Sequence, residues 1–168
     1  MKKILLCLLC FVALLGCIAC SGNGEEAKAY VFRYDGTELA IDGELPAILE
    51  ALGKYDRHET KPSCNHDGDA HFYYYGTKFE LESYPKDGKD RLYRITLYDD
   101  TVKTAEGICI GDNKDAVTKA YGEATEEKGR TLLYRAGDMY LRFHLSKEDR
   151  VAQIDYLHPD ALKNENQG

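Results

Sequence analysis

The sequence has little of what a nucleic-acid-binding protein or an enzyme needs. Its 22 basic residues are outnumbered by 29 acidic ones, so neither nucleic acid nor an anionic membrane surface is an electrostatic target. It has no Trp and four Pro, and 43% of its residues are apolar, which excludes collagen-like and disordered chains. The sequence contains no Gly-x-Ser-x-Gly, no His-Glu-x-x-His and no phosphate-binding glycine loop. We therefore expect a globular protein that is not an enzyme and needs no cofactor.

Residues 1–20 have the pattern of an export signal. Two lysines precede an uncharged run, Ile4–Cys20, and residues 21–28 form a polar, flexible tether. A small residue before a Cys at the end of such a run resembles the lipobox of bacterial lipoproteins. That resemblance implies a diacylated cysteine, cleavage before it and a position on the extracytoplasmic face of the bacterial membrane. Cys20 adjoins the tether and is the expected lipidation site, with Cys17 as the alternative. An uncleaved anchor or a plain cleaved signal would place the remainder on the same side.

Two cysteines, Cys64 and Cys109, lie outside the signal segment. In an oxidising compartment they could form a disulfide. The bond would close a loop of roughly 46 residues, worth about 4 kcal/mol in the chain-entropy model. The alternative is two separate cysteines, one in a loop and one buried, and both interpretations stay open.

The mature chain begins with a predicted hairpin and a predicted helix. Ala29–Tyr34 and Thr37–Ile41 have strand composition and flank Asp35-Gly36, a strong two-residue turn signal. Leu45–Leu52 places its large apolar residues on one helical face, and Gly53 is a natural helix stop.

This helix recurs 69 residues later, with Asp112 as its expected cap. The matching positions are Ile41 with Ile110, Ala47 with Ala116, Ala51 with Ala120 and Gly53 with Gly122. Further along the offset falls to 59, where Asp90–Ile95 aligns with Asp149–Ile154. The sequence thus predicts an α+β fold of two tandem helix-plus-three-strand repeats. Their bounds are 29–98, including the hairpin, and 108–160, with a linker at 99–107 and a disordered tail at 161–168.

Two such units side by side would form one antiparallel sheet with both helices on one face. The other face would be open. Alternation in Met139–Leu145 sends one set of side chains to that open face. Tyr, with 13 copies, suits recognition because it offers a large contact area at low entropic cost, although strand propensity alone also explains its frequency. The expected binding face comprises Tyr73, Tyr75, Tyr84, Tyr140, Arg142 and His144.

The helix–strand tandem resembles the β-lactamase-inhibitor-protein-like fold, which small outer-membrane assembly lipoproteins share. The residues that carry this resemblance are Ile110-Gly111-Asp112, Val117 and Tyr121-Gly122. Longer segments resemble a family of uncharacterised surface lipoproteins from Clostridia-type Gram-positive bacteria. These segments are Phe32–Gly36, Pro62–Cys64, Tyr84–Asp90 and Asp99–Ile108. The resemblance implies a fold and a location but no activity. In that family position 109 is usually a small residue such as Ser, which weakens the case for a disulfide with Cys64.

The segment 54–71 has the densest group of potential metal ligands. Cys64, His66 and His71 could supply sulfur and nitrogen, but their spacing matches no closed zinc site. Asp67-Gly68-Asp69 lacks the later Glu of a calcium loop. A solvated connection explains the whole segment, so we assign no metal site.

These observations favour a membrane-anchored extracytoplasmic binding module whose partner is a protein or an envelope polymer. The open sheet face would make the contact, and nucleic acid has no part in it. The alternative is a small-ligand or metal-binding surface lipoprotein that uses the 54–71 segment. A structural assembly factor is a third hypothesis, by analogy with envelope lipoproteins of the same fold.

Overall fold

The computed structural model describes residues 29–63 and 68–165. The strands are β1 Phe32–Tyr34, β2 Thr37–Leu39, β3 Arg57–Pro62, β4 Asp69–Tyr75, β5 Phe79–Lys86, β6 Lys89–Leu97, β7 Glu126–Lys128, β8 Thr131–Ala136, β9 Met139–Leu145 and β10 Val151–Leu157. The helices are α1 Leu45–Leu52, α2 Lys114–Tyr121 and α3 Asp160–Glu165.

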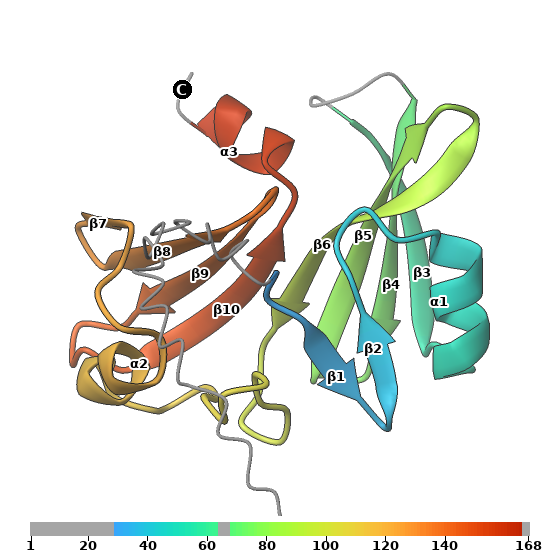
Figure 1. Cartoon of the computed structure of the whole chain (residues 1–168). Coiled ribbons are helices and arrows are strands. Elements are labelled where there is room, and N and C mark those ends of the chain that lie inside the picture. The colour runs from blue at the N-terminus through green and yellow to red at the C-terminus, as the bar shows by residue number, and fades with distance from the viewer. Residues whose placement is uncertain (1–28, 64–67, 166–168) are drawn as a thin grey trace, which may run out of the picture.

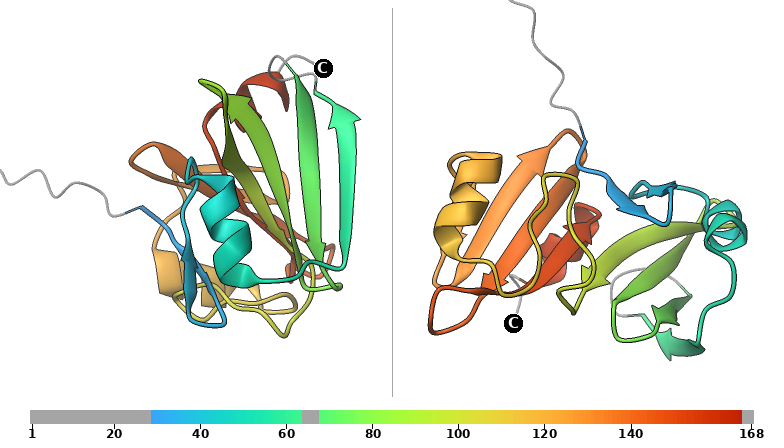
Figure 2. Two further views of the ribbon diagram at one scale, coloured as in Figure 1. Left: turned by 90° about the vertical axis from the view of Figure 1, so that its right-hand side faces the viewer. Right: turned by 90° about the horizontal axis from the view of Figure 1, so that it is seen from below.

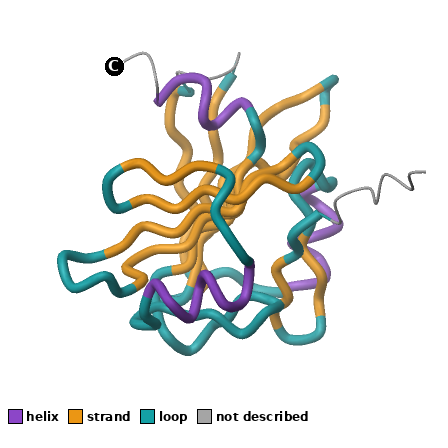
Figure 3. Tube along the Cα trace, turned by 60° about the vertical axis from the view of Figure 1, so that its left-hand side comes forward, coloured by secondary structure: helices purple, strands orange, loops and turns teal. Residues whose placement is uncertain are grey.

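Eight strands form one antiparallel sheet in the order β3-β4-β5-β6-β10-β9-β8-β7 (Figure 1). The strands appear as one band in the Cα trace, with the helices around it (Figure 3). β6 and β10 pair at the centre of the sheet over four residue pairs, from Leu97↔Ile154 to Arg94↔Leu157. The fold is therefore α+β with a large antiparallel sheet, as the sequence predicts.

The hydrophobic core lies on the face of the sheet that α1 and α2 cover. Directly paired residues share a face, so a row of buried side chains crosses the sheet. This row runs Tyr73, Leu81, Ile95, Tyr156, Leu141 and Tyr134. Leu45 and Ile48 of α1 and Val117 of α2 belong to the same core cluster. Both helices therefore lie on one face, which we call the helix side.

The helices begin and end close to where the sequence predicts. Pro46 lies in the first turn of α1, and Gly53 ends it with a φ of 74°, a left-handed conformation that Gly adopts without strain. Gly122 ends α2 with a φ of 77°. The cap of α2 is Asn113, whose side chain accepts a hydrogen bond from the Ala116 amide at 2.8 Å. The expected cap, Asp112, instead accepts from the Cys109 amide at 2.9 Å.

The predicted N-terminal hairpin is present as a separate two-stranded sheet, β1 and β2. Asp35 and Gly36 both have positive φ, as this tight turn requires. The hairpin packs on the helix side. The Phe32 ring is fully buried, with its centroid 5.3 Å from that of Phe79 and 5.8 Å from that of Tyr156. Because Phe79 lies in β5 and Tyr156 in β10, this ring joins the two halves of the sheet.

The chain order places one helix before four strands in each half of the sheet, where three strands were expected. The additional strands, β3 and β7, are the two edges. β3 has the polar sequence RHETKP and β7 reads EEK, so neither has the apolar alternation that reveals a half-buried strand.

The same backbone contacts occur in both halves at the two offsets found in the sequence. The Asp42 amide donates to the Leu92 carbonyl, and the Leu92 amide donates to the Gly43 carbonyl. In the second half the Gly111 amide donates to the Val151 carbonyl, and the Val151 amide donates to the Asp112 carbonyl. Each helix thus begins from an equivalent position against the last strand of its own half. The left view of Figure 2 shows α1 in front of the half-sheet that follows it in the chain.

Residues 161–165 contradict the expectation of a disordered tail at 161–168, the end of which lies outside the described residues. Residues 160–165 form α3, and Ala161 is 1% exposed. Ala161 packs in a second apolar cluster with Tyr84, Tyr93 and Leu157. The helix is too short to show a periodic pattern, and its stability comes from this contact.

Candidate functional site

The face opposite α1 and α2, which we call the open face, carries polar and aromatic side chains. One row of directly paired residues crosses all eight strands on this face. It runs Arg57, Tyr74, Glu80, Thr96, Asp155, Arg142, Leu133 and Glu126. A second row runs Glu59, Phe72, Glu82, Arg94, Leu157, Tyr140 and Arg135. The open face is therefore chemically unlike the apolar helix side.

Asp155 is the centre of a buried ionic cluster on the open face. Its carboxylate accepts from Arg142 Nε at 2.9 Å and from Gln153 Nε2 at 2.8 Å, and it lies 3.1 Å from His144 Nε2. Burial would raise the pKa of Asp155, but the His144 hydrogen bond and the Arg142 charge lower it below its ordinary value. Asp155 is thus a fixed anion, and it holds the side chains of Arg142 and His144 in place.

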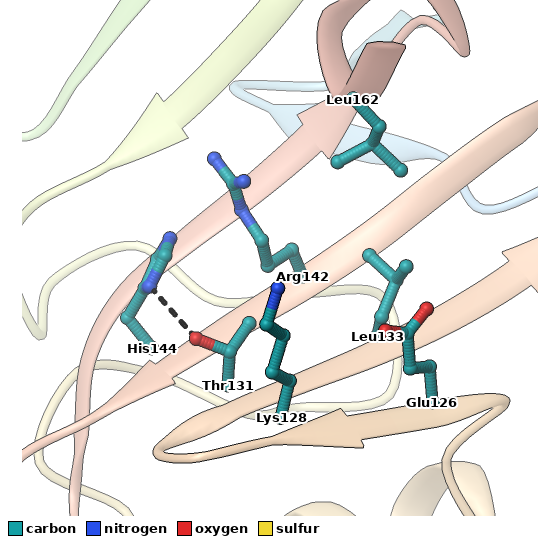
Figure 4. Close-up of a pocket in the computed structure, with 7 residues that line it drawn as sticks. All are labelled: Glu126, Lys128, Thr131, Leu133, Arg142, His144 and Leu162. Atoms are coloured by element: carbon teal, nitrogen blue, oxygen red, sulfur yellow. Dashed lines mark hydrogen bonds between the residues drawn. The ribbon is translucent and has the colours of Figure 1, made fainter. Parts of the chain in front are cut away.

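A pocket of about 210 Å³ opens beside this cluster (Figure 4). Its lining comes from β7, β8, β9 and α3: Glu126, Lys128, Thr131, Leu133, Arg142, His144 and Leu162. Thr131 Oγ1 lies 3.4 Å from His144 Nδ1, so His144 is held from both of its nitrogens. The pocket has basic side chains at one end and two leucines at the other, so it suits a small ligand with a polar group and an apolar part.

The other half of the open face presents aromatic rings with charged partners. The Arg57 guanidinium lies 3.7 Å from the Tyr74 ring centroid, and the Tyr74 hydroxyl donates to Glu59 at 3.2 Å. The Lys61 ammonium lies 4.6 Å from the Phe72 ring centroid. Tyr98 is 44% exposed, the largest exposure among the described large apolar residues. This combination of accessible rings and charges is typical of recognition surfaces.

Glu82 and Arg94 form an ion pair between the two groups, at 3.2 Å. Burial raises the pKa of Glu82, and the Arg94 charge opposes that rise. The open face therefore has two ion pairs close to its middle, Arg94–Glu82 and Arg142–Asp155, which fix its charge pattern before any partner binds.

Three of the six expected face residues lie where the sequence places them. Tyr140, Arg142 and His144 are on the open face. Of these, Arg142 is 6% exposed because it is paired with Asp155, so its side chain contributes little accessible area to the open face.

The other three residues need correction. Tyr73 and Tyr75 point to the helix side and are buried, at 9% and 7% exposure, because they pair with Leu81 and Phe79. Tyr84 is buried with Ala161 beneath α3, the helix that the sequence analysis treats as a disordered tail. In the aromatic run of β4, the rings on the open face are instead those of Phe72 and Tyr74, which are half-buried.

Several residues of the open face escape sequence reasoning. Tyr98 follows the last core residue of β6, and alternation alone could have placed it opposite Leu97. Asp155 had no such signal, because its role depends on side chains of β9 that pair with β10 only in the folded sheet.

The remaining candidates are the cysteines. Cys17, Cys20 and Cys64 lie outside the described residues. Cys109 is a buried free thiol whose Sγ lies 3.6 Å from Asp112 Oδ2, and burial raises its pKa. Because Cys64 lies outside the described residues, its disulfide with Cys109 stays a prediction.

Comparisons with known proteins support the fold. No model of a known protein family matches the chain, and no curated protein does. An extracellular protein containing an SCP domain from Bacillus anthracis matches with a TM-score of 0.55 and 13% identity, over 75% of this chain and 46% of that one. A cysteine-rich secretory protein from Staphylococcus aureus matches with a TM-score of 0.52 and 14% identity, over 73% of this chain and 46% of that one.

The chain thus spans about half the length of both solved structures. At this identity the likeness shows the fold alone. Within residues 29–63 and 68–165, no helix has the length and apolar character needed to cross a membrane.

Proposed function

We propose that this protein is a lipid-anchored, extracytoplasmic binding module without catalytic activity, whose open sheet face holds a protein or an envelope polymer. The observation that carries this proposal is the contrast between the two faces of the sheet. The helix side is largely covered by α1, α2 and the hairpin. The open face, which α3 covers over Tyr84 and Leu157, presents the half-buried rings of Phe72 and Tyr74 and the exposed ring of Tyr98 among fixed charges. Accessible rings beside charged groups offer a partner both contact area and hydrogen-bonding groups.

The location rests on the sequence. The polar tether after Cys20 and the lipobox-like end of the signal segment favour anchoring at the outer face of the membrane. The two similar solved structures are described as extracellular and secretory proteins, which accords with this location. Mass spectrometry of the native protein should find a diacylated cysteine at the new N-terminus. Cys20→Ser should release the protein from membranes while Cys17→Ser leaves it attached; the reverse result would move the anchor to Cys17.

A capture experiment tests the open face. The chain, immobilised, is exposed to solubilised cell envelope, and bound material is compared between the unchanged chain and Tyr74→Ala/Tyr98→Ala. We expect the double variant to lose most of its captured partner. Tyr55→Ala is the matched control, because Tyr55 is an exposed tyrosine at 36% on the other side of the sheet. Equal capture by the double variant, or an equal loss with Tyr55→Ala, would remove the open face as the contact surface.

We further infer that the two halves are copies of one helix-plus-strands unit. The sequence matches at offsets of 69 and 59 and the paired hydrogen bonds at Leu92 and Val151 support this. The isolated bridges Glu44↔Arg91 and Asn113↔Arg150 have the same two offsets. An experimental structure whose halves superimpose over these positions tests the inference, and halves with different helix–sheet packing would refute it.

A further inference from the structure

The hairpin of β3 and β4 brings two histidines together at the edge of the sheet. His58 is paired with Tyr73, and His71 with Thr60, so the two imidazoles lie diagonally on one face of the hairpin. His58 Nε2 lies 3.3 Å from His71 Nδ1, while the ring centroids are 5.4 Å apart. Their nitrogens, and not their ring faces, therefore make the close approach.

Neighbouring side chains hold both rings in this position. The His58 ring stacks on Tyr73 with centroids 4.5 Å apart and planes inclined by 18°, and Tyr55 meets it edge-on at 6.1 Å. Thr60 Oγ1 lies 3.1 Å from His71 Nδ1, a contact that a metal ion on Nδ1 would replace. A pair of rings that is already positioned loses little conformational entropy when a ligand binds.

The spacing of the two nitrogens matches the demands of a metal ion. Zinc–nitrogen bonds of about 2.0–2.1 Å at a tetrahedral angle place two nitrogens roughly 3.3–3.4 Å apart. Imidazole nitrogen suits Zn²⁺, Cu²⁺ and Ni²⁺, with Cu²⁺ bound most strongly in the general order of these metals. We propose that His58 Nε2 and His71 Nδ1 together bind a divalent transition-metal ion at this edge.

The arrangement defines what kind of site this is. Within the described residues, no group of three His, Cys, Asp or Glu side chains comes together, so this part of the chain supplies two ligands to the ion. Such a site is weak and exchangeable rather than structural. Each ring must carry its proton on the nitrogen that faces away from the metal, and a tautomer change of one ring achieves this without net proton release. The site lies on the helix-side face of the sheet, so it is independent of binding at the open face.

The test uses the purified full chain with Zn²⁺ in titration calorimetry and Cu²⁺ in electron paramagnetic resonance. His58→Gln and His71→Gln should each weaken Zn²⁺ binding at least tenfold. The double variant should show no saturable binding, because it has neither imidazole. The Cu²⁺ spectrum of the unchanged chain should show two coupled nitrogens, and each single variant should lose that pattern. Both positions are accessible enough for folded variants, since His58 is exposed and His71 is half-buried.

Two control variants make the result specific. His158→Gln changes a histidine far along the chain, and His66→Gln changes the one outside the described residues. Both should bind as the unchanged chain does. Absence of saturable binding, or binding that persists in the His58→Gln/His71→Gln variant, would overturn the proposal, as would a loss that follows His66→Gln alone.

Discussion

The buried ion pair between Arg142 and Asp155 allows a quantitative test of the structure. Asp155 is 0% exposed and the Arg142 side chain 7%, and the two are joined at 2.9 Å. Replacing Asp155 by Asn removes the charge that Arg142 and His144 share while keeping the shape of the side chain. Breaking one partner of such a pair costs about 3–5 kcal/mol, because the other charge stays in a poorly hydrated position.

The measurement is urea unfolding followed by far-ultraviolet circular dichroism. Against a typical domain stability of about 5–15 kcal/mol, Asp155→Asn should lose roughly a fifth of the total or more. The control is Glu38→Gln, which breaks the Arg33–Glu38 pair, whose side chains are 53% and 55% exposed. An exposed pair contributes at most about 1 kcal/mol. If Asp155→Asn is no more destabilising than Glu38→Gln, the buried cluster does not hold the centre of the open face as described.

Three further predictions concern stability. The pKa of Asp155 in the folded protein lies below its ordinary value of 3.8. Its contribution to the free energy of unfolding is therefore intact above about pH 4 and is lost as the pH falls through the folded pKa. Acid should lower the urea midpoint of the unchanged chain more than that of Asp155→Asn. Val117→Ala should lower the free energy of unfolding by about 2 kcal/mol in urea, because the side chain is fully buried between α2 and the sheet. Lys119→Ala on the same helix should change it by no more than about 0.5 kcal/mol. Equal losses in the two variants would contradict the packing of α2. Ala161→Asp should destabilise the protein by about 2 kcal/mol or more, because it places a charge in the apolar cluster beneath α3. Lys163→Ala on the same helix should change the stability little. An Ala161→Asp variant as stable as the unchanged chain would mean that α3 does not pack on the sheet.

Local signals in the sequence predict the elements that depend on neighbouring residues. Asp35-Gly36 specifies the hairpin because a turn of two residues with positive φ needs such a pair. The apolar spacing of Leu45–Leu52 and the stop at Gly53 define α1. Alternation in β9 assigns Tyr140, Arg142 and His144 correctly, because only one of the two alternating sets there is apolar.

The features that the sequence could not give depend on other parts of the chain. In β4 both alternating sets are aromatic, so the pairing with β5 decides which rings are buried. The edge strands β3 and β7 are polar on both faces, and each is held in the sheet by pairing with one neighbouring strand. α3 is stabilised by its contact with Tyr84, and the histidine pair of β3 and β4 requires the register of their hairpin.

The position of Phe32 gives the hairpin a mechanical consequence. The chain enters the described fold through β1, and the first ring of that strand is wedged between β5 and β10. Tension applied upstream of the domain, as a membrane tether would apply it, therefore reaches the joint between the two half-sheets before it reaches either helix. The hairpin is therefore the first element that such tension would load, while the pairing of β6 with β10 still joins the two halves.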